Sequence, residues 1–252
     1  MRREYPILEF DPERRAMIEP VPNRSVDMPE HCVVCFFQDV ITALREAGRM
    51  REVWLLGSEM GTHPVYELDI NGRRIALFHP GVGAPLAAAF LDEVIGLGCR
   101  KFIACGGAGV LNGEIAMGHL VVPTSAVRDE GVSYHYLPPS REVTANPTGV
   151  AAIEGILQEQ GASYLLGKTW TTDAIYRETP TKVQRRRDEG CLTVEMEAAA
   201  FFAVAEFRGV IFAQILYGGD SLGGDEWDSR DWVRSPVRER LLWLAIDACL
   251  RL

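Results

Sequence analysis

The segment of residues 193–225 constrains the fold of this chain more than any other part of the sequence. It predicts a short strand that ends in Glu195-Met196-Glu197, followed by a helix of Ala, Phe and Val residues to about Phe207. A second strand, apolar from Val210 to Leu216, then stops at Gly218-Gly219-Asp220. Two adjacent buried strands that end in acids are typical of a binding site, because ligands lie beyond the carboxyl ends of such strands. The alternative is that these acids are simply solvated at the rim of a sheet.

Strands and helices alternate along the rest of the chain. Residues 65–70 alternate between apolar and polar, Asn71-Gly72 favours a type I′ turn, and residues 74–79 return as the second strand of a hairpin. Residues 133–139 read as a loop with three ring side chains. Further strands are expected at residues 32–37, 53–56, 101–105, 119–123 and 126–128 and from residue 169, and further helices at residues 38–48, 150–160, 180–189 and 237–250.

Two glycine-rich loops are candidates for binding an anion. Gly81 and Gly83 precede a helix that runs to about Leu97, and Gly106 and Gly107 follow the strand 101–105. Backbone N–H groups in such loops can approach an anion closely, and a helix dipole assists them. We therefore expect a phosphate, carboxylate or ribose near these glycines, with ordinary turns as the alternative.

The composition is that of a globular protein, and its charge excludes some partners. The 252 residues are 47% hydrophobic and 24% charged, which allows one large α/β domain. A net charge of -9 argues against a nucleic-acid or membrane surface, since phosphate backbones demand clustered Lys and Arg. The first residues lack the apolar core of a signal peptide and no run reaches transmembrane length, so we expect a cytoplasmic protein.

The six cysteines do not suggest a metal site. Cys32 and Cys35 have C-x-x-C spacing, but residues three apart on a strand point to opposite faces. The other four are scattered singly among apolar neighbours, so buried free thiols are expected. No ligand cluster in the sequence predicts a bound metal.

Four motifs together resemble the nucleoside phosphorylase superfamily, which contains purine nucleoside phosphorylases, uridine phosphorylases and nucleosidases. The sequence V-E-M-E-A-A at 194–199 resembles the signature of the family. The resemblance extends through residues 81–85, 102–110 and 126–131, in the family's order, and covers roughly residues 32–225.

This resemblance implies a three-layer α/β/α sandwich with a mixed central β-sheet, which the alternation of strands and helices supports. We expect residues 31–252 to form this single domain and residues 1–30 to be an extended arm, lying on the domain or on a neighbouring subunit. Family members are usually dimers or hexamers, so a homo-oligomer is expected, with the arm and residues 134–136 as candidate contacts.

The resemblance also assigns the ribose and the base of a nucleoside to particular residues. Met196 would pack on the sugar, and Glu197 would accept hydrogen bonds from the 2′- and 3′-hydroxyls. Asp220 aligns with the aspartate that assists departure of a purine at N7. An arginine at 230 or 234 could pair with Asp220, or could lie in a solvated loop. The residues expected around the base are Asp173, Ile175, Tyr176 and Arg177.

The nucleophile is the part of the family pattern that this sequence matches least. Phosphorylases of the family bind phosphate with a G-D-P-x-R loop after the first strand, where this chain reads F-F-Q-D-V at 36–40. The arginine before the second glycine loop is replaced by Ala104, which leaves Arg128 as a candidate for phosphate. Nucleosidases activate water with a glutamate after the first strand, and the nearest carboxylate here is Asp39.

We therefore expect an enzyme that cleaves the N-glycosidic bond of a nucleoside, with a purine favoured. Phosphate is the expected nucleophile, because phosphorolysis is the commoner chemistry of the family, and no other cofactor is required. The alternatives are a nucleosidase that uses water, a pyrimidine-specific enzyme of the uridine phosphorylase kind, and a protein that binds a nucleoside or nucleotide without cleaving it.

Overall fold

The computed structural model describes residues 2–20, 26–224, 226–230 and 237–252. Its strands are β1 His31–Cys35, β2 Arg51–Ser58, β3 Gly61–Ile70, β4 Arg73–Phe78, β5 Lys101–Val110, β6 Leu120–Asp129, β7 Glu142–Thr144, β8 Tyr164–Thr172, β9 Cys191–Glu195 and β10 Ile211–Ser221. Its α-helices are α1 Gln38–Glu46, α2 Ala84–Leu97, α3 Ser133–Tyr136, α4 Pro147–Glu159, α5 Pro180–Asp188, α6 Ala198–Arg208 and α7 Val237–Cys249, with short 3-10 turns η1 Pro6–Leu8 and η2 Ile175–Arg177.

The strands form one mixed sheet that closes on itself at one end. The order is β10-β6-β8-β9-β5-β1-β4-β3-β2, and β10 also pairs with β5. Strands β5, β10, β6, β8 and β9 therefore form a ring, while β1, β4, β3 and β2 extend from β5 as an open sheet. Long apolar strands suit such a sheet because both of their faces are covered.

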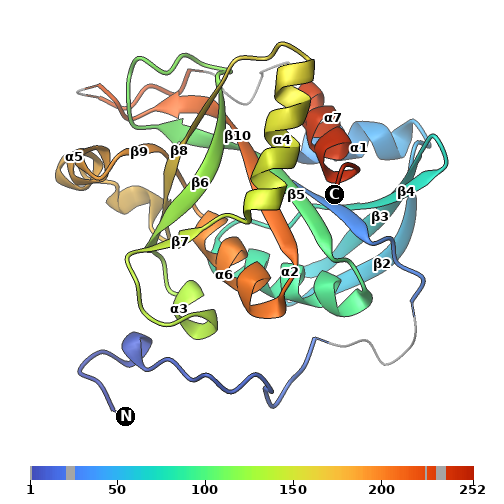
Figure 1. Ribbon diagram of the computed structural model, residues 1–252, viewed down its shortest axis with the longest axis horizontal. Coiled ribbons are helices and arrows are strands. Elements are labelled where there is room, and N and C mark those ends of the chain that lie inside the picture. Colours follow the sequence, from blue (N-terminus) through green and yellow to red (C-terminus); the bar gives the residue numbers. More distant parts are fainter. Residues whose placement is uncertain (1, 21–25, 225, 231–236) are drawn as a thin grey trace.

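Helices cover the sheet on both faces (Figure 1). One layer contains α2, α6 and α3, with α6 packed on β10, β6, β7 and β8. The other contains α4 and α7, with α7 packed on β5 and β1. The mixed α/β fold with a central mixed sheet is as predicted, and the closed ring is a feature that the prediction lacked.

The arrangement of β9 and β10 differs from the one predicted for two adjacent strands. Strand β5 lies between them, and β9 runs antiparallel to β5 whereas β10 runs parallel to it. The acids nevertheless meet, because β9 is only five residues long and pairs with the last residues of β5. A short strand entering from the opposite direction ends where the long strand β10 also ends.

Local predictions succeeded where turn chemistry fixes the backbone. Asn71 and Gly72 have φ of 54° and 81°, as the type I′ turn between β3 and β4 requires. The prediction of a second glycine-rich loop was wrong, because Gly106 and Gly107 lie inside β5 and pair with Leu216 and Tyr217 of β10. Residues 133–136, predicted as loop, form the short helix α3.

The N-terminal arm runs beneath α3 and α6 (Figure 1). The Arg14 guanidinium lies 4.6 Å from the centre of the Phe207 ring, and Glu19 forms an ion pair with Arg208 at 3.8 Å. A cavity of about 580 Å³ lies between this arm and helices α2 and α6, and none of the predicted site residues lines it. The division into an arm and a single domain stays a prediction.

The interior contains the predicted free thiols. All six cysteines are buried and none forms a disulfide. The described residues include no group of three or more His, Cys, Asp or Glu side chains that could hold a metal ion. Within the same part of the chain, no helix combines the length and apolar character that crossing a membrane requires.

Candidate active site

The end of β9, which carries Glu195, and the end of β10, which carries Asp220, both lie beside the end of β5. Gly109 of β5 pairs with Val194 of β9, and on its other side lies Asp220 of β10. A side chain at Gly109 would meet Val194 Cγ1 at 3.0 Å and Asp220 Oδ1 at 3.4 Å. The absence of a side chain at this position therefore lets the ends of β9 and β10 approach one another.

The two glutamates of the V-E-M-E-A-A motif have different tasks. Glu195 Oε2 accepts the backbone N–H groups of Glu197 and Ala198 at 2.7 and 2.5 Å, and Thr171 donates its hydroxyl to Oε1 at 2.6 Å. These bonds fix the start of α6 and hold the Glu197 backbone. Burial raises the pKa of Glu195 to about 7, although these donors oppose the rise.

Glu197 is the glutamate that remains for a ligand. Its carboxyl group is buried, and Oε1 accepts the N–H of Gly83 at 2.6 Å. Burial, together with the negative charge of Glu195, raises the pKa of Glu197 to about 8. Hydroxyl donors would offset this desolvation, so the position suits a ribose diol. Met196 is half-buried beside it. The ribose contacts of both residues stay predictions.

Asp220 and Glu178 form a pair of carboxyl groups across the site from the Glu195–Glu197 pair. Asp220 Oδ2 accepts the indole N–H of Trp227 at 2.7 Å. Burial and the negative charge of Asp220 raise the pKa of Glu178 to about 7, and Lys182 opposes the rise. Such a pair can both accept a hydrogen bond and donate a proton.

The residues predicted around the base lie in and before η2, and their exposure differs. Asp173 Oδ2 accepts the N–H of Gly131 at 2.8 Å, and its charge contributes to the raised pKa of Glu197. Ile175 is 54% exposed, whereas Tyr176 is 95% exposed. The Arg177 side chain is exposed, and it forms no hydrogen bond or ion pair with any of the described residues. These base contacts stay predictions.

The groups predicted to bind phosphate already have partners. Gly81 donates its N–H to Nδ1 of His79 at 3.0 Å, and Gly83 donates to Glu197. Gly106 and Gly107 lie in the β5–β10 ladder, where the rings of Phe36 and Tyr217 fill the space beside them. Backbone N–H groups that are already bonded cannot form the cradle that an anion requires.

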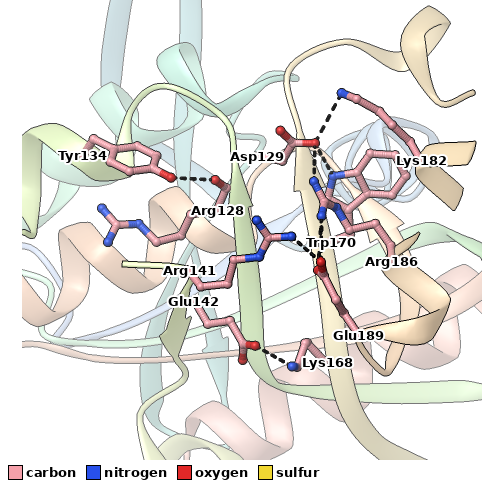
Figure 2. A network of polar contacts seen from close by, with 10 residues as sticks. All are labelled: Arg128, Asp129, Tyr134, Arg141, Glu142, Lys168, Trp170, Lys182, Arg186 and Glu189. Atoms are coloured by element: carbon pink, nitrogen blue, oxygen red, sulfur yellow. Dashed lines mark hydrogen bonds and ion pairs between the residues drawn. The ribbon is translucent and has the colours of Figure 1, made fainter. Parts of the chain in front are cut away.

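The guanidinium of Arg128, the candidate for phosphate, is likewise engaged. It donates to Ser133 Oγ at 2.8 Å, to Ser140 Oγ and the Pro138 carbonyl at 2.7 Å each, and to the Leu137 carbonyl at 3.2 Å. It also stacks on the ring of Tyr134, at 4.3 Å (Figure 2). Arg128 thus ties residues 133–140 to β6, and its assignment to phosphate has no support from these contacts.

Asp39 lies in the first turn of α1 and is 57% exposed. Its Oδ1 accepts Nη1 of Arg238 from α7 at 2.9 Å. This ion pair joins the start of α1 to α7 and occupies the Asp39 carboxylate. Of the arginines considered for Asp220, Arg230 donates instead to the Ile115 carbonyl at 2.8 Å, and Arg234 lies outside the described residues.

Sequence reasoning missed Glu178 and Trp227. The position of Glu178 carried a signal, because it directly precedes Thr179, and Thr179 with Pro180 is typical of a helix start. Trp227 carried none, since its approach to Asp220 depends on the two hydrogen bonds between Ser221 and Asp228 that fold the chain back.

Comparisons with known proteins establish the family. The family model of the phosphorylase superfamily matches residues 30–247, so the chain belongs to this superfamily. It is 26% identical to the guanosine phosphorylase of Halorubrum lacusprofundi over 74% of this chain and 80% of that protein. The crystal structure of uridine phosphorylase from Vibrio fischeri superposes with a TM-score of 0.74 and 26% identity, over 88% of this chain and 90% of that one.

A nucleosidase shares the same fold. The AMP nucleosidase of Bacteroides thetaiotaomicron superposes with a TM-score of 0.74 and 22% identity, over 91% of this chain and 90% of that one. The family predicted from the four motifs is confirmed, as is the prediction of an enzyme, either a phosphorylase or a nucleosidase.

Proposed function

We propose that the protein cleaves the N-glycosidic bond of a purine nucleoside and that water is the nucleophile. The observation that carries this proposal is that the predicted phosphate ligands Gly81, Gly83 and Arg128 are bonded within the chain, while buried Glu197 and Asp220 beside Gly109 supply carboxyl groups. Cleavage passes through a positively charged sugar and an anionic leaving base. Carboxyl groups can stabilise the first, and a protonated one can neutralise the second.

A purine is favoured because its N7 accepts a proton from an acid beside the ring. The resemblance aligns Asp220 with the aspartate that purine-cleaving members use. It also implies that Thr179 and Thr181 take the positions where pyrimidine-specific members have a Gln and an Arg. These threonines supply no charge for a uracil ring, and Arg177 is the nearby residue that would have to substitute for a uridine-cleaving enzyme.

Water is favoured over phosphate because the predicted phosphate ligands have other partners. The N–H groups of Gly81 and Gly83 are bonded within the chain, and Arg128 holds residues 133–140. Water carries no charge and needs no such cradle.

Phosphorolysis is the second candidate, and the names of relatives favour it. One is a guanosine phosphorylase and another, of known structure, a uridine phosphorylase. In that case residues other than those predicted, or residues of a second subunit, would bind phosphate.

A product assay with and without phosphate tests the proposal. Purified protein would be incubated with guanosine, inosine, adenosine, uridine and AMP, and bases and sugars quantified by HPLC. We expect purine release at equal rates in both buffers, with free ribose as the sugar product. Release that requires phosphate and yields ribose 1-phosphate would establish phosphorolysis instead. No release from any substrate, with nucleoside binding retained, would indicate a protein that binds without cleaving.

A further inference from the structure

The turn between β4 and α2, residues 79–83, contacts the carboxyl group of Glu197. Its last residue, Gly83, donates its backbone N–H to Glu197 Oε1 at 2.6 Å. Gly83 also begins α2, since its carbonyl accepts the N–H of Ala87 at 3.1 Å. The direction of the Gly83 N–H depends on the path of the turn, and the position of the Glu197 carboxyl group depends on that N–H.

Two glycines leave the path of this turn dependent on another constraint. Gly81 and Gly83 have φ of 79° and 91°, a region that glycine enters freely and that other residues avoid. Glycine has many accessible conformations, so it permits this path without selecting it. A Cβ atom at Gly81 would also meet Leu86 Cδ2 at 2.4 Å, so a side chain at this position cannot stiffen the turn.

His79 supplies the constraint. Its Nδ1 accepts the backbone N–H of Gly81 at 3.0 Å, which closes the turn from the side chain. A backbone N–H can only donate, so Nδ1 carries no proton and the ring is neutral, with its proton on Nε2. Burial lowers the pKa of His79, a hydrogen bond to the backbone of Phe36 opposes this shift, and the charge of His63 adds to it. The surroundings therefore favour the neutral form that the turn requires.

The His79 ring is itself held by packing. It lies edge-on to the ring of Phe36, with 5.9 Å between the ring centroids and 69° between the ring planes. Phe36 in turn contacts the ring of Phe201 at 6.3 Å. Phe201 lies in the first part of α6, and its N–H donates to the carbonyl of Glu197 at 3.0 Å. The three rings therefore connect the turn to the start of α6, where Glu197 lies.

We propose that His79 is a positioning residue for the ribose, because by fixing the turn at Gly81 it directs the Gly83 N–H to Glu197. This inference rests on the proposed function and on the predicted contact between Glu197 and the ribose hydroxyls. His79 acts through the turn and does not itself touch the substrate. Its loss should weaken recognition of the 2′- and 3′-hydroxyls and leave recognition of the base unchanged.

A pair of substrates tests this role. Guanosine carries both ribose hydroxyls and 2′,3′-dideoxyguanosine carries neither, so only guanosine can donate hydroxyls to Glu197. His79→Phe retains a ring against Phe36 and removes the acceptor nitrogen. We expect this variant to lower kcat/KM on guanosine about 10-fold and to change kcat/KM on the dideoxynucleoside less than about 3-fold. His79→Ala should give the same selective loss, and it replaces the Phe variant if that variant does not fold.

The conservative variant is His79→Asn. An Asn side chain accepts the N–H of the residue two positions further on, as Nδ1 of His79 does. We expect it to restore kcat/KM on guanosine to within about 3-fold of the wild type. The control is His135→Phe, which replaces an exposed histidine of α3 and should change neither rate.

The outcomes separate this inference from the proposed function. Equal losses on both substrates, an unchanged kcat/KM on guanosine in His79→Phe, or no rescue by His79→Asn would overturn the role of His79. If the wild type binds guanosine but releases no guanine, the proposed function alone is wrong, and the same ratios are expected for the dissociation constants. If the wild type binds neither nucleoside, both proposals are wrong.

Discussion

Replacing Glu197 with Gln should stabilise the protein at neutral and alkaline pH while removing the carboxyl group that is predicted to bind the ribose. The pKa of Glu197 rises from 4.5 to about 8 on folding, because burial and the charge of Glu195 disfavour ionisation. Between these values the group is neutral when folded and charged when unfolded. Unfolding then releases a proton, and the free energy of unfolding falls with rising pH by up to about 1.4 kcal/mol per pH unit. Over the whole window this amounts to roughly 5 kcal/mol as an upper bound.

The measurement is urea unfolding of both proteins from about pH 4 to pH 8.5, with the free energy of unfolding extrapolated to water. Below pH 4.5 the free energies of unfolding of the two proteins should differ by a constant amount. From there to pH 8 the free energy of unfolding of the Gln variant should increase steadily relative to that of the wild type. Glu206→Gln, an exposed change on the same helix, is the control and should show no such gain. Parallel curves for wild type and Glu197→Gln would refute the argument that burial holds this acid neutral.

Two further predictions concern the leaving-group side of the site. Asp220→Asn should lower kcat on a purine nucleoside by roughly 100-fold or more, since the variant lacks the carboxyl group that the resemblance assigns to the departing purine. An unchanged steady-state rate would remove Asp220 from the mechanism. Asp129→Asn should cost roughly 2–4 kcal/mol in urea unfolding, because it removes one of the two carboxylates that pair with Arg186, whose side chain is 6% exposed; Glu189 is the other. A loss below about 0.5 kcal/mol would show that α5 is held by other contacts.

Much of the fold was predictable because its signals are local. Alternating polarity and the Asn71-Gly72 turn specify the β3–β4 hairpin without reference to the rest of the chain. The helix that follows Glu197 is marked by a run of Ala and Phe residues, and α6 runs from Ala198 to Arg208. Both kinds of signal depend on a few neighbouring residues, so the sequence alone is sufficient.

The glycines show where local reasoning was insufficient. Gly81 has φ of 79° and lies in a turn before α2, as predicted, whereas Gly106 and Gly107 are part of a strand. The same residue type permits a loop, and it also permits close approach of two aromatic rings to a strand. Only the packing of Phe36 and Tyr217 decides between these uses; Phe36 directly follows β1, and Tyr217 lies in β10.

The sequence by itself determined the class of fold, the family and the acids at residues 195, 197 and 220, since each is encoded within a short motif. The tertiary structure alone decided which acids share an environment. The pairing of β10 with β5 closes the ring and brings Asp220 beside Gly109, and the attachment of α5 to Asp129 brings Glu178 to Asp220. The ability of a carboxyl group to hold or donate a proton depends on its burial and on neighbouring charges, and these come from segments distant in the chain.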